Sequence, residues 1–260
     1  MPACHKSRSA FPPIWESPPT KHFVNTMIDY TKHEGAAITE DMIDDIAVSF
    51  SENYGVWGPA VKPEKQGRRV RASPARLRAD CLPSSPARNF LVQAKDKHRL
   101  VGHVIATRWT FENLSICWIT QLCVNMRYRH QGLATKLLIK LSEDNDDSAV
   151  GILSSHPFAI AAVLRALGKR LRQTNECIGN SQIKTIMASC PVDYVRTARL
   201  RGSAFESNVD DGTISCADTK FFVDHAEPHA ALDALRDKGI KWPLGRLPEG
   251  HEFLAFVERP

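Results

Sequence analysis

The stretch ICWITQLCVNMRYRHQGLATKLLIKL, residues 116–141, has three parts whose order decides the fold. Residues 116–124 are an apolar run rich in β-branched and aromatic side chains, which predicts a buried strand. Residues 125–131 are polar and basic, as is typical of a turn. From Gly132 onward leucines recur at helical spacing, so residues 132–141 are predicted to form a helix with one apolar face.

A strand that leads through a short turn into a helix can bind an anion. The first N–H groups of a helix have no partner within the helix, and the helix dipole favours negative charge there. Gly132 lets a ligand approach the backbone closely because it has no Cβ atom. Donors for phosphate oxygens come from four nearby side chains, Arg127, Arg129, His130 and Lys136. An ordinary solvated connection would look the same, so the residues alone leave both interpretations open.

The segment Arg129-His130-Gln131-Gly132-Leu133-Ala134 resembles the R/Q-x-x-G-x-G/A motif of the GNAT superfamily of N-acetyltransferases. The strand before it and the leucine-rich helix after it fit the same family, and the resemblance extends over residues 88–168. It implies an α/β fold with a mixed, mostly antiparallel sheet that contains a splayed parallel strand pair and is flanked by helices. The parallel pair is expected between residues 116–124 and 149–155.

The resemblance also implies that acetyl-CoA is the acyl donor. In the family, backbone amides of the motif loop hold the pyrophosphate, and the pantetheine arm enters between the splayed strands. Backbone N–H groups at the end of the first of these strands are expected to polarise the thioester carbonyl. The residues expected to bind acetyl-CoA are Leu122, Cys123, Val124, Arg129, His130, Gln131, Gly132, Leu133, Ala134, Thr135 and Ser155.

Composition limits the other classes of partner. The net charge of +5 suits a polyanion such as coenzyme A and is too small to indicate nucleic acid. The seven cysteines show no C-x-x-C and no metal-ligand spacing with histidines, so no metal is expected, and Cys117 and Cys123 are expected to be buried free thiols. No apolar run suits a membrane span or a signal segment, which predicts a cytoplasmic or nuclear protein. The oligomeric state stays open, with a homodimer as one option.

The chain is expected to carry a proline-rich, irregular arm at residues 1–22 and a single domain at 23–260, with a helical insertion near 173–217. Other predicted elements are a helix over 40–52 capped by Thr39, a helix that starts at Ser73-Pro74, a hairpin of 88–94 with 98–111, helices over 181–190 and 192–201, and closing strands over 219–225 and 251–258.

Residues 50–58, FSENYGVWG, form an aromatic segment with several helix breakers. They are loosely similar to uncharacterised fungal GNAT-like proteins, a similarity that names no substrate. Tyr54 and Trp57 are expected to contact substrate, although rings that close the edge of the core would give the same pattern.

The catalytic groups that the resemblance implies are missing. Many family members carry a Glu or His base on the strand that here is 116–124, whose polar members are only Thr120 and Gln121. The family often places a general-acid Tyr in the helix that here is 157–171, which contains none. His156 and Tyr194 are the expected substitutes. The alternatives are a helix-capping or core histidine and a packed tyrosine ring, and the nearby Asp224, His225 and Glu227 are expected to form a polar turn.

The resemblance thus implies an N-acetyltransferase, an acyltransferase of EC 2.3.1 type, that transfers acetyl directly to an amine in a ternary complex. The aromatic segment and the helical insertion favour a small-molecule amine over a long peptide. The missing base and tyrosine support an alternative, a non-catalytic GNAT-like module that binds coenzyme A or a partner.

Overall fold

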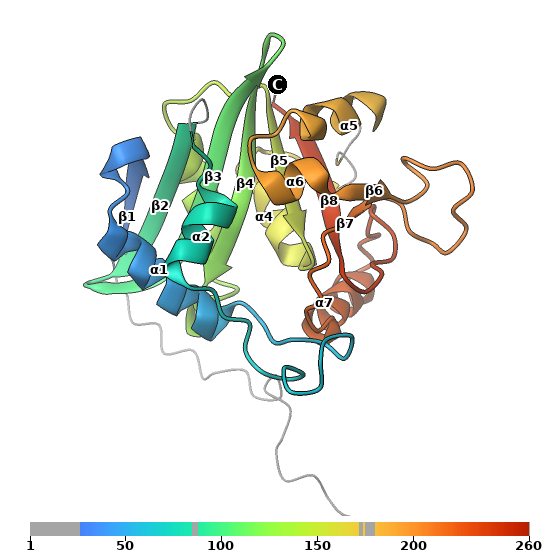
Figure 1. Ribbon diagram of the computed structural model, residues 1–260, viewed down its shortest axis with the longest axis horizontal. Coiled ribbons are helices and arrows are strands. Elements are labelled where there is room, and N and C mark those ends of the chain that lie inside the picture. The colour runs from blue at the N-terminus through green and yellow to red at the C-terminus, as the bar shows by residue number, and fades with distance from the viewer. Residues whose placement is uncertain (1–26, 85–87, 172–173, 175–179, 260) are drawn as a thin grey trace, which may run out of the picture.

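The computed structural model describes residues 27–84, 88–171, 174 and 180–259, which form one eight-stranded sheet flanked by helices (Figure 1). The strand order is β1-β2-β3-β4-β5-β8-β7-β6. The strands are β1 (Ile28–Glu34), β2 (Arg88–Asp96), β3 (Arg99–Phe111), β4 (Leu114–Val124), β5 (Ala149–Ser154), β6 (Arg199–Arg201), β7 (Cys216–Asp218) and β8 (His251–Glu258). Strands β4 and β5 run parallel and the other recorded pairs are antiparallel, which confirms the predicted fold class.

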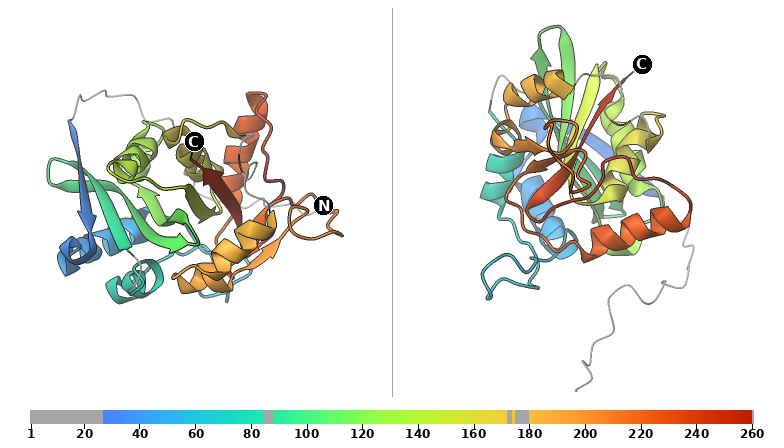
Figure 2. Two further views of the ribbon diagram at one scale, coloured as in Figure 1. Left: turned by 90° about the horizontal axis from the view of Figure 1, so that it is seen from above. Right: turned by 90° about the vertical axis from the view of Figure 1, so that its right-hand side faces the viewer.

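Helices cover both faces of this sheet. They are α1 (Glu40–Asn53), α2 (Pro74–Cys81), α3 (Leu133–Ser142), α4 (Pro157–Ala166), α5 (Asn180–Ala188), α6 (Asp193–Thr197) and α7 (Ala226–Asp237), with short 3₁₀ turns η1 (Gly35–Ala37) and η2 (Met126–Tyr128). Helices α3 and α4 pack on one face, and α1, α2, α5 and α6 on the other (Figure 2). None of these helices has the length and apolar character needed to cross a bilayer.

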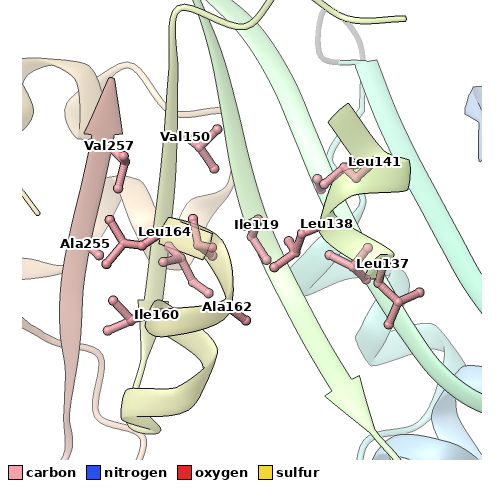
Figure 3. Close-up of a cluster of buried hydrophobic side chains, with 14 of the residues drawn as sticks. Ile119, Leu137, Leu138, Leu141, Val150, Ile160, Ala162, Leu164, Ala255 and Val257 are labelled. Carbon is pink, nitrogen blue, oxygen red and sulfur yellow. The ribbon is translucent and has the colours of Figure 1, made fainter. Parts of the chain in front are cut away.

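The stretch that decides the fold forms β4, η2 and α3 in the predicted order. Four leucines of α3, Leu133, Leu137, Leu138 and Leu141, are buried, and Figure 3 shows Leu138 beside Ile119 of β4. Burying such side chains contributes about 1.5–3 kcal/mol each. The helical leucine pattern therefore fixes which face of α3 meets the sheet, and with it the direction in which the helix start points.

The parallel pair opens where β4 carries an extra residue. Ile105 of β3 lies opposite Gln121, and the next residue, Ala106, lies opposite Ile119, so Thr120 is a β-bulge. Pairing of β4 with β5 ends at Ile119 opposite Ile152, although β4 runs on to Val124. The two strands separate directly after the bulge, which confirms the expected splay.

Local signals placed several elements correctly. The Thr39 hydroxyl caps α1 by accepting a hydrogen bond from the Met42 N–H at 3.3 Å, and Ser73 caps α2 in the same way with Arg76 at 3.2 Å. Strands β2 and β3 form the predicted hairpin, with Lys97 in the left-handed region at φ 56°. Cys117 and Cys123 are buried free thiols, as expected.

The C-terminal part differs from its prediction in two places. The helix expected over 192–201 is the shorter α6, and residues 199–201 form β6. The strand expected over 219–225 does not form: β7 covers Cys216–Asp218 and ends before it, and only Val223 makes an isolated bridge, with Trp57. The Asp218 carboxylate accepts a hydrogen bond from the Lys220 N–H at 3.2 Å, and Lys220 has a φ of 56°, so the chain turns there instead of continuing as a strand. The arm at 1–22 lies outside the described residues.

Candidate functional site

The start of α3 presents unpaired backbone N–H groups. The first helical bond joins the Lys136 N–H to the Gly132 carbonyl at 3.0 Å, so the N–H groups of residues 133–135 precede the helical ladder and have no acceptor in the described part of the chain. Gly132 has a φ of 81° and His130 a φ of 61°, conformations that turn successive N–H groups toward a common centre. A Cβ atom at Gly132 would meet no atom within 4 Å, so the space in front of this glycine is open.

Side chains of the motif brace this loop rather than surround the open space. The Arg129 guanidinium donates to the Val124 carbonyl at 3.3 Å and to the Asn53 carbonyl at 2.5 Å, and it forms an ion pair with Glu227. Gln131 donates to the Arg127 carbonyl at 3.0 Å. The loop is thus tied to α1, β4 and α7, while its backbone N–H groups stay available to a ligand.

His156 lies at the end of β5 and caps α4. Its Nδ1 accepts a hydrogen bond from the Phe158 N–H at 3.2 Å, and its Nε2 lies 3.3 Å from the Glu227 carboxylate. The neutral ring therefore carries its proton on Nε2, and the lone pair on Nδ1 is already used. This geometry matches the helix-capping alternative for His156. Ser154 and Ser155 are buried beside it, and the Ser154 hydroxyl accepts from the His156 N–H at 3.1 Å.

Glu227 joins the motif loop to His156, a connection that the sequence reading missed. Burial raises the pKa of the Glu227 carboxyl, but the contacts with His156 and Arg129 outweigh this effect and hold the pKa below its usual value. Glu227 and Arg129 are far apart in the sequence, so no local pattern indicated the pair.

The end of β4 lines the opening between the parallel strands. From Thr120 to Val124 its edge toward β5 has no ladder partner. Cys123 on this segment is buried, and burial raises the pKa of its thiol to about 12. Cys123 therefore packs in the core as a neutral thiol, while Leu122 and Val124 stay partly exposed beside the opening.

Tyr194 reaches the base of this opening from α6. Its hydroxyl donates a hydrogen bond to the Thr120 carbonyl at 3.2 Å, so the bulged residue also receives the tyrosine. Burial, with smaller contributions from nearby acidic groups, raises the pKa of Tyr194 well above its usual value. The phenol therefore stays protonated at neutral pH, and its O–H is the donor in the bond to Thr120.

Tyr54 and Trp57 meet a third ring, Phe221, that the sequence reading did not select. The Tyr54 ring stacks on Phe50 with centroids 4.4 Å apart and lies 5.7 Å from Phe221. Trp57 meets Phe221 edge-on at 5.5 Å. The outer rings are only partly buried, so this aromatic cluster (Tyr54, Trp57 and Phe221) closes the core edge and also presents ring surface.

Glu252 of β8 is the second residue that the sequence reading missed. Only 6% of it is exposed, and no Lys, Arg or His in the described part of the chain forms an ion pair with it. Burial raises the pKa of its carboxyl to about 7, against an opposing contribution from the Thr219 hydroxyl. The signal was present: HEFLAFVE places one charged residue inside an otherwise buried strand.

A hollow in the surface lies elsewhere. It has a volume of about 710 Å³ and is lined by residues such as Trp109, Thr110 and Ser115, where β3 turns into β4. The motif loop follows the opposite end of β4. The described residues contain no group of three or more His, Cys, Asp or Glu side chains placed to hold a metal ion.

Comparisons with known proteins gave one family match and several distant structural likenesses. Residues 60–144 match the family model described as the acetyltransferase (GNAT) family, which confirms the resemblance seen in the sequence. The ribosomal-protein-S18-alanine N-acetyltransferase of Escherichia coli is similar at 14% identity, over 52% of this chain and 74% of that one, with a TM-score of 0.35. An N-acetyltransferase of Staphylococcus aureus Mu50 is similar at 6% identity, over 89% and 97% of the two chains, with a TM-score of 0.39.

An aminoglycoside acetyltransferase from an uncultured soil metagenomic sample, in complex with sisomicin, is similar at 12% identity over 46% of this chain and 70% of that one, with a TM-score of 0.32. No curated protein matches the chain. The structural likenesses are too distant to carry a conclusion on substrate.

Proposed function

Residues 60–144 match the GNAT family model, and we propose that this protein is an acetyl-CoA-dependent N-acetyltransferase. It would transfer the acetyl group directly to the amine of a small molecule. The observation that carries this proposal is the loop before α3, where a left-handed Gly132 and unpaired N–H groups face open space beside the splayed strands. Such a loop suits a diphosphate, because several N–H donors and the helix dipole act on it together.

We expect the pantetheine arm of acetyl-CoA, which carries the acetyl group, to enter between the separated strands β4 and β5. A chain entering between β4 and β5 meets the unpaired edge of residues 120–124, whose N–H groups can hold amide oxygens and polarise a thioester carbonyl. Ser155 lies at the end of β5 on the other side of the opening. We assign cofactor contacts to the backbone at Leu122, Cys123 and Val124, to Ser155, and to the loop from His130 to Thr135.

Catalysis by direct transfer needs the amine and the thioester in one complex. The aromatic cluster supports binding of the acceptor on the face opposite α3. We assign to Tyr194 the donation of a proton to the departing sulfur; its raised pKa keeps the phenol protonated, and its hydroxyl lies beside the splay, 3.2 Å from the Thr120 carbonyl, a bond that it would exchange for the sulfur. His156 has both ring nitrogens engaged, so we assign it a positioning role, through Glu227, on the motif loop.

Thermal unfolding with and without acetyl-CoA tests the proposal. Ligand at about 100 times its Kd adds roughly 2.7 kcal/mol to the folded state, which raises the Tm by about 5–10 °C for a protein of this size. The rise should disappear in Gly132→Glu, because a carboxylate then occupies the open space and repels the diphosphate. Gly239→Glu is the matched control: Gly239 also has a positive φ (68°) and an open Cβ position, but it closes α7.

A well-folded wild type whose Tm does not move with acetyl-CoA would contradict the proposal. A rise in Tm without release of the coenzyme A thiol across a panel of small amines would instead identify a binding module. Loss of the rise in both glycine variants would mean that strain, rather than the loop, is responsible.

A further inference from the structure

The placement of Glu252 follows from the sheet register. Phe253 lies opposite Ser154, the last residue of β5, so Glu252 lies just beyond the end of that strand, where β4 and β5 have separated. Side chains alternate along β8, and Leu254 and Phe256 pack with α5 and α6. The Glu252 carboxylate therefore lies on the face opposite α3, away from the loop assigned to the diphosphate.

Two tyrosines share this region with Glu252. Tyr194 packs against the cluster that contains Leu254 and Phe256, on the same face of β8 as Glu252, and Tyr54 follows α1 on that face. Burial, and further the charge of Glu252, raises the pKa of both tyrosine hydroxyls. Tyr54 comes from the end of α1, Tyr194 from α6 and Glu252 from β8. Three separate elements thus bring one acid and two phenols to the same side of the splay.

A buried carboxylate without a cation is costly. Taking it out of water is not offset by an ion pair in the described part of the chain. Groups held in this way are frequent at functional sites, where a ligand supplies the missing charge. The aromatic cluster beside it presents partly exposed rings, and ring faces attract ammonium ions.

We propose that Glu252, with the aromatic cluster of Tyr54, Trp57 and Phe221, forms the acceptor site for a primary ammonium carried on an aromatic group, and that Glu252 takes its proton. This inference rests on the acetyltransferase function proposed above. It assigns the role of general base, for which β4 offers no residue, to Glu252 on β8, the strand that pairs with β5.

The chemistry balances without a further reactant. Glu252 removes one proton from the ammonium, and the nitrogen lone pair then forms the C–N bond with the thioester carbonyl carbon. The C–S bond breaks with its electron pair on sulfur. Tyr194 gives the sulfur its proton and regains one from the acetylated nitrogen, and Glu252 releases the first proton to water. The products are the acetamide, the coenzyme A thiol and one proton.

The test compares Glu252→Gln with Glu249→Gln, an exposed residue three positions away that undergoes the same chemical change. The probes are benzylamine, phenethylamine and tyramine, with 2-phenylethanol as the uncharged partner of phenethylamine. Release of the coenzyme A thiol gives kcat/KM from pH 5.5 to 8.5. Calorimetry in the presence of coenzyme A measures binding of the same four compounds.

The wild type is expected to bind and acetylate the amines, to bind 2-phenylethanol more than tenfold more weakly, and to show kcat/KM rising with pH up to about 7. Glu252→Gln should lose about 10²–10⁴-fold in kcat/KM, together with that pH-dependent limb. It should keep the acetyl-CoA-induced rise in Tm. Glu249→Gln should behave as the wild type does.

Two results would overturn the inference while leaving the proposed function intact. One is an acetyl-CoA-stabilised wild type that neither binds nor acetylates any of the three amines. The other is a Glu252→Gln variant with the wild-type pH profile. A wild type that acetyl-CoA does not stabilise would instead contradict the proposed function itself.

Discussion

Arg108 and Asp147 form a two-pronged ion pair inside the protein. The Arg108 Nε and Nη2 atoms lie 2.6 and 3.0 Å from the two Asp147 oxygens, and the side chains are only 3% and 1% exposed. The same guanidinium donates to the Leu141 carbonyl at 3.1 Å and lies 4.2 Å from the Phe90 ring centroid. The pair therefore ties β3 to the end of α3 and to the segment that enters β5.

Removing one partner of this pair should be strongly destabilising. Asp147→Asn leaves the Arg108 charge buried without compensation, so we expect unfolding free energy to fall by about 3–5 kcal/mol. Urea unfolding measures the loss. The control is Asp80→Asn, which breaks the exposed pair of Asp80 with Arg76 and should cost less than about 0.5 kcal/mol. Equal small losses in both variants would contradict the structural role of the buried pair.

Gly151 should be intolerant of a methyl group. A Cβ atom there would lie 2.3 Å from the Trp118 ring, across the parallel pair of β4 and β5. Gly151→Ala is expected to cost about 1–3 kcal/mol, measured by urea unfolding, because the ring must shift in a filled core. Gly55→Ala, where a Cβ meets nothing within 4 Å, is the control and should change stability by less than about 1 kcal/mol. An unchanged Gly151→Ala variant would show that Trp118 moves freely.

His103 should make folding sensitive to mild acid. It is fully buried, its Nε2 lies 2.7 Å from the Gln121 side-chain oxygen, and burial lowers its pKa to about 4. The folded state then resists protonation that the unfolded chain accepts below its pKa of about 6.5, so stability falls as pH drops from 6.5 toward 4. His103→Gln should flatten this decline by up to about 3 kcal/mol, measured as the unfolding free energy at several pH values.

The exposed His98 gives the matched control, since His98→Gln should leave the acid slope unchanged. Glu252 acts with the opposite sign: its raised pKa means that its contribution is present below about 4.5 and is lost as pH rises through about 7. The contribution of His103 is therefore obtained by comparing the pH dependence of the unfolding free energy in the variant with that in the wild type, and not from one protein alone. An unchanged slope in His103→Gln would contradict the buried neutral imidazole.

Glu227 should matter for the motif loop more than for stability. Glu227→Gln removes the charge that Arg129 and His156 share, so the loop loses its tie to α7, and we expect acetyl-CoA binding to weaken about tenfold in calorimetry. The control Asp233→Asn breaks an exposed ion pair with Arg236 on the same helix and should leave binding unchanged. Equal affinities in wild type and Glu227→Gln would show that the loop needs no such tie.

The features predicted most accurately from the sequence are those that depend on residues close together in the chain. The strand, turn and helix around Gly132, and the caps at Thr39 and Ser73, depend on residues a few positions apart, and the structure has them as expected. The end of β7 at Asp218 was missed because the Asp218 side chain competes with strand pairing through the Lys220 N–H, which strand propensity ignores.

The missed parts of the candidate site depend on distant residues. Tyr54 meets Phe221, and Arg129 meets Glu227, only because the sheet brings separate segments together. The role of His156 turned on which atoms its two nitrogens meet, which spacing does not reveal. Glu252 was visible as an acid in an apolar strand, but its nearness to the splay depends on the register of β8 against β5.

The opening beside Thr120 coincides with a feature of strand length. Here β4 carries one residue more than the stretch of β3 that it pairs with, and its pairing with β5 ends at the preceding residue, Ile119. Replacing Thr120 by another amino acid keeps this extra residue, whereas deleting one residue there would leave β3 and β4 with equal numbers of residues. Substitutions can therefore change the side chains that line the opening while the bulge that marks its start, which depends on the number of residues in β4, stays in place.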